Sequence, residues 1–241
     1  MYESLVALAA IAAGALASVV GFGIGSLLTP VLAMQAGTKV AVAAVSIPHL
    51  VGTAVRFALI AGHIDRRVFW SFGLTSAAGG LTGALLHARL GGPVLAAIFG
   101  CLLIFVAISE LTGLSTRLRF EGPAAWIAGA LSGVLGGLVG NQGGIRSAAL
   151  IGLHLRRDAF VATATAVGLM VDAARMPVYF FTERDAVIAL WPLIAIATAG
   201  VVAGTLGGRR VLRHIPEAWF HKIVAVALAA LGLAMLRSAA Y

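Results

Sequence analysis

The sequence predicts an all-α polytopic membrane protein built from two homologous halves. Of its 241 residues, 61% are hydrophobic and only 11% are charged, which is more apolar surface than a water-soluble domain can bury. Apolar stretches such as 4–38 and 186–208 contain no Asp, Glu, Lys or Arg and reach the roughly 20 residues that a membrane-spanning helix needs. An internal repeat, with a glycine-rich break in each copy, completes the prediction.

The repeat is visible as residues that recur at a fixed distance. Residues 16–56 recur as 135–175, 119 positions later, with these matches in and around them: Gly14/Gly133, Gly21/Gly140, Gly25/Gly144, Val42/Val161 and Arg56/Arg175. A second set recurs 121 positions later: Trp70/Trp191, Gly79/Gly200, Gly83/Gly204 and Arg89/Arg210. We therefore predict a first membrane repeat at 1–111, a connecting loop at 112–123 and a second membrane repeat at 124–241.

Each half is predicted to begin with a re-entrant helical hairpin, at about 4–36 and 124–155. The arm that follows each glycine break has only about 12 residues, so a helix there is about 18 Å long at 1.5 Å per residue. A membrane core is about 30 Å thick. The chain is therefore expected to enter the membrane, turn at the glycines and leave on the same side.

Three full spans are predicted after each hairpin. In the first half they lie near 41–62, 68–87 and 93–111, and in the second half near 159–181, 186–207 and 217–236. Pro93 and Pro216 fall at or near the first turn of the last span of each half, where a missing N–H costs nothing.

Basic residues favour this topology. With hairpins, the 14 Lys and Arg residues outside the membrane positions divide 10 to 4 between the two sides, whereas two full crossings would divide them 8 to 6. The positive-inside rule favours the first division, with both termini periplasmic in a bacterial inner membrane. Three crossings per half make the halves inverted repeats, while full crossings would make them parallel. The net charge of +8 lies in short loops, so no nucleic-acid partner is predicted. No cofactor and no metal site is predicted either. The sequence leaves the oligomeric state open.

The two breaks are the candidate binding site for a small anionic substrate. The first contains Gly23, Gly25 and Ser26, and the second contains Asn141, Gln142, Gly143, Gly144 and, just after it, Arg146. Each break is followed by a short helix whose N-terminus carries partial positive charge, and Arg146 supplies a fork of N–H donors. The alternative is that the glycines only allow close helix packing.

Four further polar residues lie within predicted spans. Arg56 and Arg175, at equivalent positions, either contribute positive potential to an anion site or have structural roles: Arg56 reaching the headgroups and Arg175 pairing with Asp172 one turn earlier. Asp172 and His49 either take up a coupling proton or are structural. The pair Ser46 and Thr165 is expected to hydrogen-bond to its own helix backbone.

The duplicated apolar halves, the segment from Gly21 to Pro30 and the GNQGG run at 140–144 resemble the TauE/SafE family of membrane permeases. The resemblance implies a transporter, expected to be an exporter, of small sulfur-containing or organic anions such as sulfite or sulfoacetate. In this prediction the two repeats alternately expose a site at the membrane midplane. Two other interpretations are a passive anion channel and an intramembrane enzyme that uses Ser132 and His154.

Overall fold

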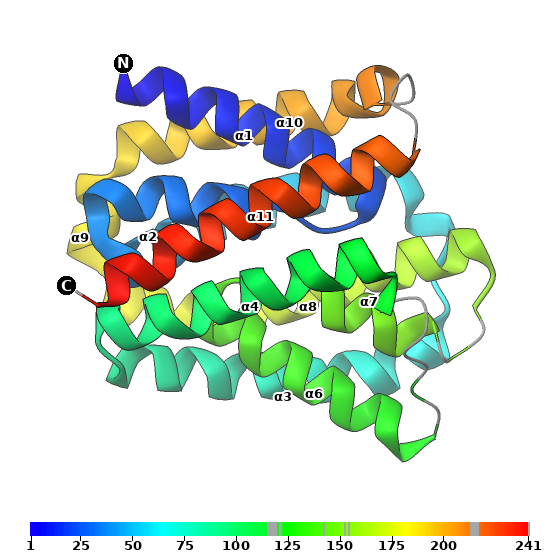
Figure 1. Ribbon diagram of the computed structural model, residues 1–241. Coiled ribbons are helices and arrows are strands. Elements are labelled where there is room, and N and C mark those ends of the chain that lie inside the picture. Colours follow the sequence, from blue (N-terminus) through cyan, green and yellow to red (C-terminus); the bar gives the residue numbers. More distant parts are fainter. Residues whose placement is uncertain are drawn as a thin grey trace.

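The computed structural model describes residues 1–114, 120, 122–141, 143–151, 153, 155–212 and 217–240, and this part of the chain contains helices and no strand (Figure 1). The helices, in chain order, are α1 (Tyr2–Val20), α2 (Ile24–Ile60), η1 (Ala61–His63), α3 (Arg66–Arg89), α4 (Gly92–Thr112), α6 (Pro123–Val139), α7 (Gly143–Ile151), α8 (Arg157–Thr182), α9 (Arg184–Ala189), α10 (Trp191–Leu212) and α11 (Glu217–Ala239).

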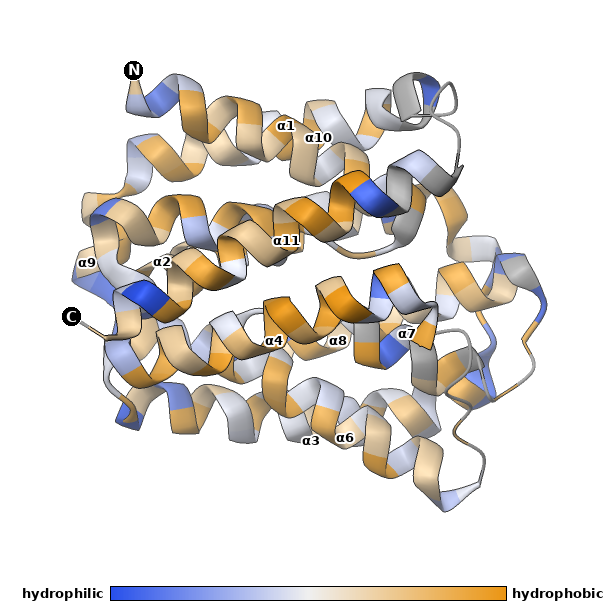
Figure 2. Cartoon of the chain, in the orientation of Figure 1, coloured by the Kyte–Doolittle hydropathy of each residue, from blue (hydrophilic) through white to orange (hydrophobic). Residues whose placement is uncertain are grey.

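Among the described residues, six helical stretches are long and apolar enough to cross a membrane. They belong to α1, α2 with η1, α4, α8, α10 and α11. Figure 2 shows apolar residues along the outer faces of the bundle, and large exposed side chains there include Leu8, Phe105, Phe181 and Leu233. Such outer faces suit lipid rather than water, so the predicted polytopic helical class is confirmed. A membrane span was also expected at 68–87. Helix α3 covers these residues and is long enough to cross a membrane, but it is not among the six.

Glycines end the first helix of each half, as predicted. Gly21 (φ 87°) and Gly140 (φ 76°) adopt the left-handed conformation and donate their N–H groups to the carbonyls of Ala17 and Gly136, four residues earlier. Residues other than glycine adopt this conformation only at a cost. The helix therefore stops inside each apolar segment.

After each break the chain turns back as a short arm. The Tyr2 hydroxyl donates a hydrogen bond of 2.8 Å to the Val31 carbonyl, so the start of α2 runs antiparallel to α1. Helix α2 then kinks at Gly37, where φ is 73°. In the second half the arm is α7, which has nine residues. Both arms are shorter than the thickness of a membrane core.

The two halves interlock rather than form separate bodies. Helix α1 packs alongside α10, α6 packs alongside α3, and α4 packs antiparallel to α11. Each glycine-broken helix thus lies against a span of the other half, and in Figure 1 α1 and α6 run in opposite directions. Opposite directions are what inverted repeats require.

Contacts between these pairs correct the sequence alignment of the repeats. A Cβ on Gly14 would overlap the Val201 carbonyl, and a Cβ on Gly133 would overlap the Ser76 carbonyl. Ser76 therefore corresponds to Val201, 125 positions later, and not to the residue 121 positions later. The six residues of α9 account for the change from 119 to 125. Glycines recur every four residues in α10, so an alignment displaced by one helical turn still matches glycine with glycine.

Polar contacts group the helix ends in the way that the charge count predicted. At one end the Lys39 ammonium lies 3.6 Å from the Glu183 carboxylate and donates to the Ala88 carbonyl. At the other end the Asp65 N–H donates to the Thr163 hydroxyl at 2.9 Å. Both termini lie at the same end of the molecule in Figure 1. Lys39 and Arg89 thus share one end of the bundle, and Arg66 and Arg67 lie at the other.

Gly204→Ile should destabilise the protein, because the side chain would overlap the Ile11 carbonyl of α1. Overpacking of this kind costs about 1–3 kcal/mol, measurable as a lower midpoint of thermal unfolding in detergent. Gly207→Ile is the matched control, since Gly207 is exposed on the same helix with nothing near its Cβ position. Equal midpoints for the two variants would contradict the α1–α10 packing.

Candidate functional site

The two breaks lie against each other in the interior. A Cβ on Gly25 would overlap the Gly140 carbonyl oxygen, and a Cβ on Gly143 would overlap the side chain of Phe22. The start of α2 therefore lies against the backbone of the second break, and the start of α7 lies against Phe22 of the first break. Gly23 is the N-cap residue of α2, and Gly144 is the second residue of α7. The predicted residue Gln142 lies outside the described part of the chain.

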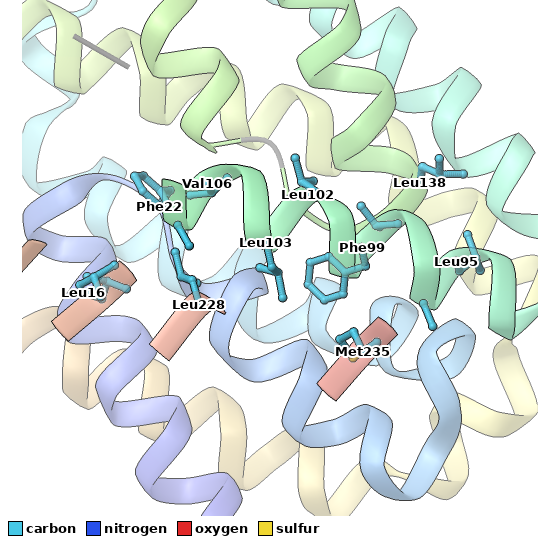
Figure 3. Packing of buried hydrophobic residues seen from close by; sticks show 14 residues of the cluster. Leu16, Phe22, Leu95, Phe99, Leu102, Leu103, Val106, Leu138, Leu228 and Met235 are labelled. Carbon is cyan, nitrogen blue, oxygen red and sulfur yellow. The ribbon is translucent and has the colours of Figure 1, made fainter. Parts of the chain in front are cut away.

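Helices α4 and α11 pack over this contact. Phe22 from the first break and Leu138 from the end of α6 belong to one buried cluster with Phe99 and Val106 of α4 and Leu228 of α11 (Figure 3). Apolar packing on this side excludes water from the breaks. The polar groups of the breaks must therefore find partners within the protein or in a bound ligand.

The repeated arginines cap the broken helices. Arg56 Nη1 donates to the Ala17 carbonyl and Arg175 Nη1 donates to the Gly136 carbonyl, both at 2.6 Å. Ala17 and Gly136 are equivalent residues of the repeat, and each also accepts the N–H of the glycine that ends its helix. A cation at a helix C-terminus is favourable because the helix end carries partial negative charge. Of the two alternatives for Arg56, that its side chain reaches the headgroups is thus wrong, since its guanidinium is bonded inside the protein and only 8% of the residue is exposed.

Asp172 contacts two polar side chains. One carboxylate oxygen accepts from Arg175 at 2.9 Å and 2.8 Å, and the other lies 2.7 Å from His49 Nδ1. The pairing with Arg175 matches the prediction, whereas the contact with His49 of α2 was missed. A signal existed in the repeat: His49 is equivalent to Gly168, which lies one helical turn before Asp172.

Arg146 is the least satisfied buried charge in the described structure. It is 3% exposed, and its Nε and Nη1 atoms have no hydrogen-bond partner. Nη1 lies against Gly168 of α8, 2.9 Å from the position that a Cβ would take. An arginine stays protonated under all ordinary conditions. A bound anion would therefore stabilise the buried positive charge of Arg146.

Other unpartnered polar groups lie on the same two arms. They are the Ser26 and Thr29 hydroxyls of the first arm and the Asn141 amide nitrogen of the second break, all buried. Thr29 was missed in the sequence, although it follows Ser26 by three residues and so lies on the same face of the arm. Buried polar atoms without protein partners are uncommon, and their grouping here suits a polar ligand.

Charge counting leads to the same conclusion. Among the residues whose burial the structure describes, three arginines are buried, Arg56, Arg146 and Arg175, whereas Asp172 is the only buried acid. Arg56 and Arg146 repel one another, and both are attracted to Asp172. The interior thus carries an excess of two positive charges, and an unneutralised buried charge is costly.

A recess opens beside Arg56. It has about 350 Å³ of empty space, part of it open to solvent, and lies between the last turn of α1, helix α7 and the first half of α8. Its polar lining consists of Arg56, Ser18, Ser147 and Thr165. The Thr165 hydroxyl donates to its own helix at Val161, and Ser46 does the same at Ala43, as expected.

The hydroxyl of Ser132, proposed above for an enzyme, is buried in α6, and His154 lies outside the described residues.

The family model for the sulfite exporter TauE/SafE family matches residues 6–235. The chain belongs to the TauE/SafE family. As a TauE/SafE protein it is a multi-pass membrane protein of a transporter family, which the six apolar helices support. No curated protein and no solved structure matches the chain.

Asp172→Asn should lower the stability of the folded protein strongly, because it leaves Arg175 without its charge partner. Breaking a buried ion pair costs about 3–5 kcal/mol, which a thermal unfolding experiment in detergent detects. Asp158→Asn is the matched control, since Asp158 is exposed in the first turn of the same helix; its loss costs at most about 1 kcal/mol. An Asp172→Asn protein as stable as this control would contradict the buried network.

Proposed function

We propose that the protein exports small sulfur-containing or organic anions, such as sulfite or sulfoacetate, by alternating access around the two helix breaks. The observation that carries this proposal is Arg146, a buried guanidinium with two unpartnered nitrogen atoms beside the breaks. Membership of the sulfite exporter family supports the class of cargo.

The polar groups of the two breaks and Arg146 suit an oxyanion. A guanidinium donates to two oxygen atoms of one anion through its planar fork. Ser26, Thr29 and Asn141 add buried donors without partners, and the N-termini of α2 and α7 add backbone N–H groups. A doubly charged anion would neutralise the two excess positive charges of the interior, and a singly charged anion would neutralise one of them. Gly23, Gly25, Gly143 and Gly144 keep the backbone close to the ligand.

Arg56 and Arg175 contribute to the same potential from their capping positions. In the proposed mechanism the anion binds between the two repeats, which then rock to expose it to the other side. An inside-negative membrane potential favours the exit of an anion by about 2.3 kcal/mol per charge per 100 mV. Export therefore needs no bound cofactor to supply energy.

Two other functions make different predictions. A passive anion channel would give fluxes far above carrier rates and no counter-flow exchange. An enzyme that uses Ser132 would lose its activity in Ser132→Ala and retain it when Arg146 is replaced. Of these functions, the unpartnered nitrogen atoms of Arg146 favour a transporter that binds its cargo and releases it again.

Arg146→Met should abolish anion binding while the protein still inserts and folds. Because Arg146 is a buried charge without a partner, its removal should leave thermal stability unchanged or raised. Wild-type protein should gain about 2.7 kcal/mol of stability from an anion at 100 times its Kd, and Arg146→Met should gain nothing. Sulfite and sulfoacetate are the anions to add, and transport into proteoliposomes is the second measurement.

Arg237→Met is the control for that variant, since Arg237 is an exposed arginine in the last turn of α11. It should keep both the ligand-induced stabilisation and the transport. Anion-dependent stabilisation that survives in Arg146→Met would remove the central residue from the proposal.

The pair of buried Asp172 and partly exposed His49 is the proposed proton-coupling group, since it connects α2 with α8 at 2.7 Å. It also faces Arg175 at hydrogen-bond distance and the charges of Arg56 and Arg146. His49→Gln should keep transport down an anion gradient but lose the dependence on an imposed pH gradient. Equal responses of wild type and His49→Gln to that gradient would refute coupling through His49.

A further inference from the structure

The last turn of α6 is sealed by three side chains. The carbonyl of Gly136 accepts from Arg175, that of Gly137 accepts from the Tyr179 hydroxyl, and that of Leu138 is bonded to His87 Nδ1 at 2.8 Å. The rings of His87 and Tyr179 lie 5.0 Å apart, and both residues are buried. Helices α3 and α8 are thus fixed to the end of α6.

The equivalent turn of α1 is not sealed in this way. Its Ala17 carbonyl accepts from Arg56, but the residue equivalent to Tyr179 is Ile60, and the residue equivalent to His87 at the structural offset of 125 is Leu212. Neither side chain can donate a hydrogen bond. The recess lies here instead, lined by Ala17, Ser18 and Val19 of this turn.

A buried charge borders this recess. Arg56 is 8% exposed, and its Nε has no partner. The lining also contains Thr165 and Ser147, which follows Arg146 in the sequence. The recess therefore extends from the surface to the residue next to the proposed binding arginine. It lies toward the end of the bundle where Asp65 meets Thr163, which is the end with Arg66 and Arg67.

We propose that this recess is the open mouth of the anion pathway and a second anion subsite, in which the Arg56 guanidinium binds a small oxyanion before it passes to Arg146. The matching position beside Arg175 is the closed mouth, sealed by Tyr179 and His87. This inference rests on the proposed function. The structure then represents the state open toward the basic, predicted cytoplasmic end, which is where an exporter collects its cargo.

The neighbouring helix end sets the affinity of this subsite. The C-terminal carbonyls of α1 carry partial negative charge and offset part of the attraction of Arg56. An anion at Arg56 is therefore held more weakly than one at Arg146, which lies near helix N-termini. A gradient of affinity in this direction suits a mouth that passes its ligand inward.

Cysteine accessibility tests the two mouths without requiring transport. Cys101 is the only cysteine of the chain and is exposed, so Cys101→Ala is the background. In it, Ser147→Cys and Thr165→Cys report on the recess. Leu28→Cys and Ser46→Cys, at the equivalent positions 119 residues earlier, are the matched controls, and both residues are buried. The measurement is the rate of labelling by a membrane-impermeant, charged thiol reagent in vesicles of each orientation.

Ser147→Cys and Thr165→Cys should be labelled from the basic end only, at least about tenfold faster than the controls, since a minor open state holds at most about 10% of the population. Sulfoacetate, which does not consume the reagent, should slow the labelling of Thr165→Cys. Equal rates at the recess and control positions, or labelling from the other end, would overturn the assignment of the mouth. Labelling that sulfoacetate leaves unchanged would overturn the subsite.

Tyr179→Phe tests the seal, because it removes one hydrogen bond and keeps the ring. It should speed the labelling of Ser46→Cys from the end opposite to the recess, and an unchanged rate would overturn the role of Tyr179. The two proposals can also fail separately. If no anion is transported but the labelling pattern holds, the exporter function is wrong and the mouth stands. Transport with a reversed pattern would refute the mouth and leave the function.

Discussion

The hydrogen bonds from Arg56 to Ala17 and from Arg175 to Gly136 make it possible for two helices to end inside an apolar bundle. A carbonyl left without a partner at membrane depth costs several kcal/mol, and a guanidinium supplies both a donor and a charge that suits a helix C-terminus. The same bonds tie α2 to α1 and α8 to α6. With both helix ends held in this way, the turns after them can come together at Gly25 and Gly140.

The capping of two helix ends by arginine has an electrostatic consequence. Two guanidiniums are needed for the two helix ends, and Arg146 adds a third, whereas Asp172 is the only buried acid in the described structure. The positive excess arises partly from residues whose contacts are with the backbone. An anion that binds beside Arg146 therefore meets a potential that the architecture itself requires, and the structural and functional roles of the arginines are not alternatives.

The two repeats share the glycines and arginines that shape and cap the backbone, and they differ in other polar side chains. The glycines that end the helices and the arginines that cap them recur. Residues without an equivalent in the other half carry the asymmetry, in these pairs: Arg146 and Leu27, Asp172 and Thr53, His49 and Gly168, Tyr179 and Ile60. A duplicated fold thus provides two similar frames, and the proposed anion site and the recess beside Arg56 lie where the residues of the two halves differ.

The sequence by itself determined the helical membrane class, the two glycine breaks and the short arms, because these depend on composition and on backbone conformation. It offered the pairing of Asp172 with Arg175, one turn apart, as one of two alternatives. Only the tertiary structure decided that Arg56 and Arg175 cap the broken helices, that His49 meets Asp172, and that Thr29 joins the unpartnered groups of the breaks. It also decided that α3 corresponds to α10 at an offset of 125. Those contacts join residues far apart in the chain. The offset needed the structure for another reason: because the glycines of α10 are spaced by four, an alignment at 121 and one at 125 both match glycine with glycine, and only the packing of the helices distinguishes them.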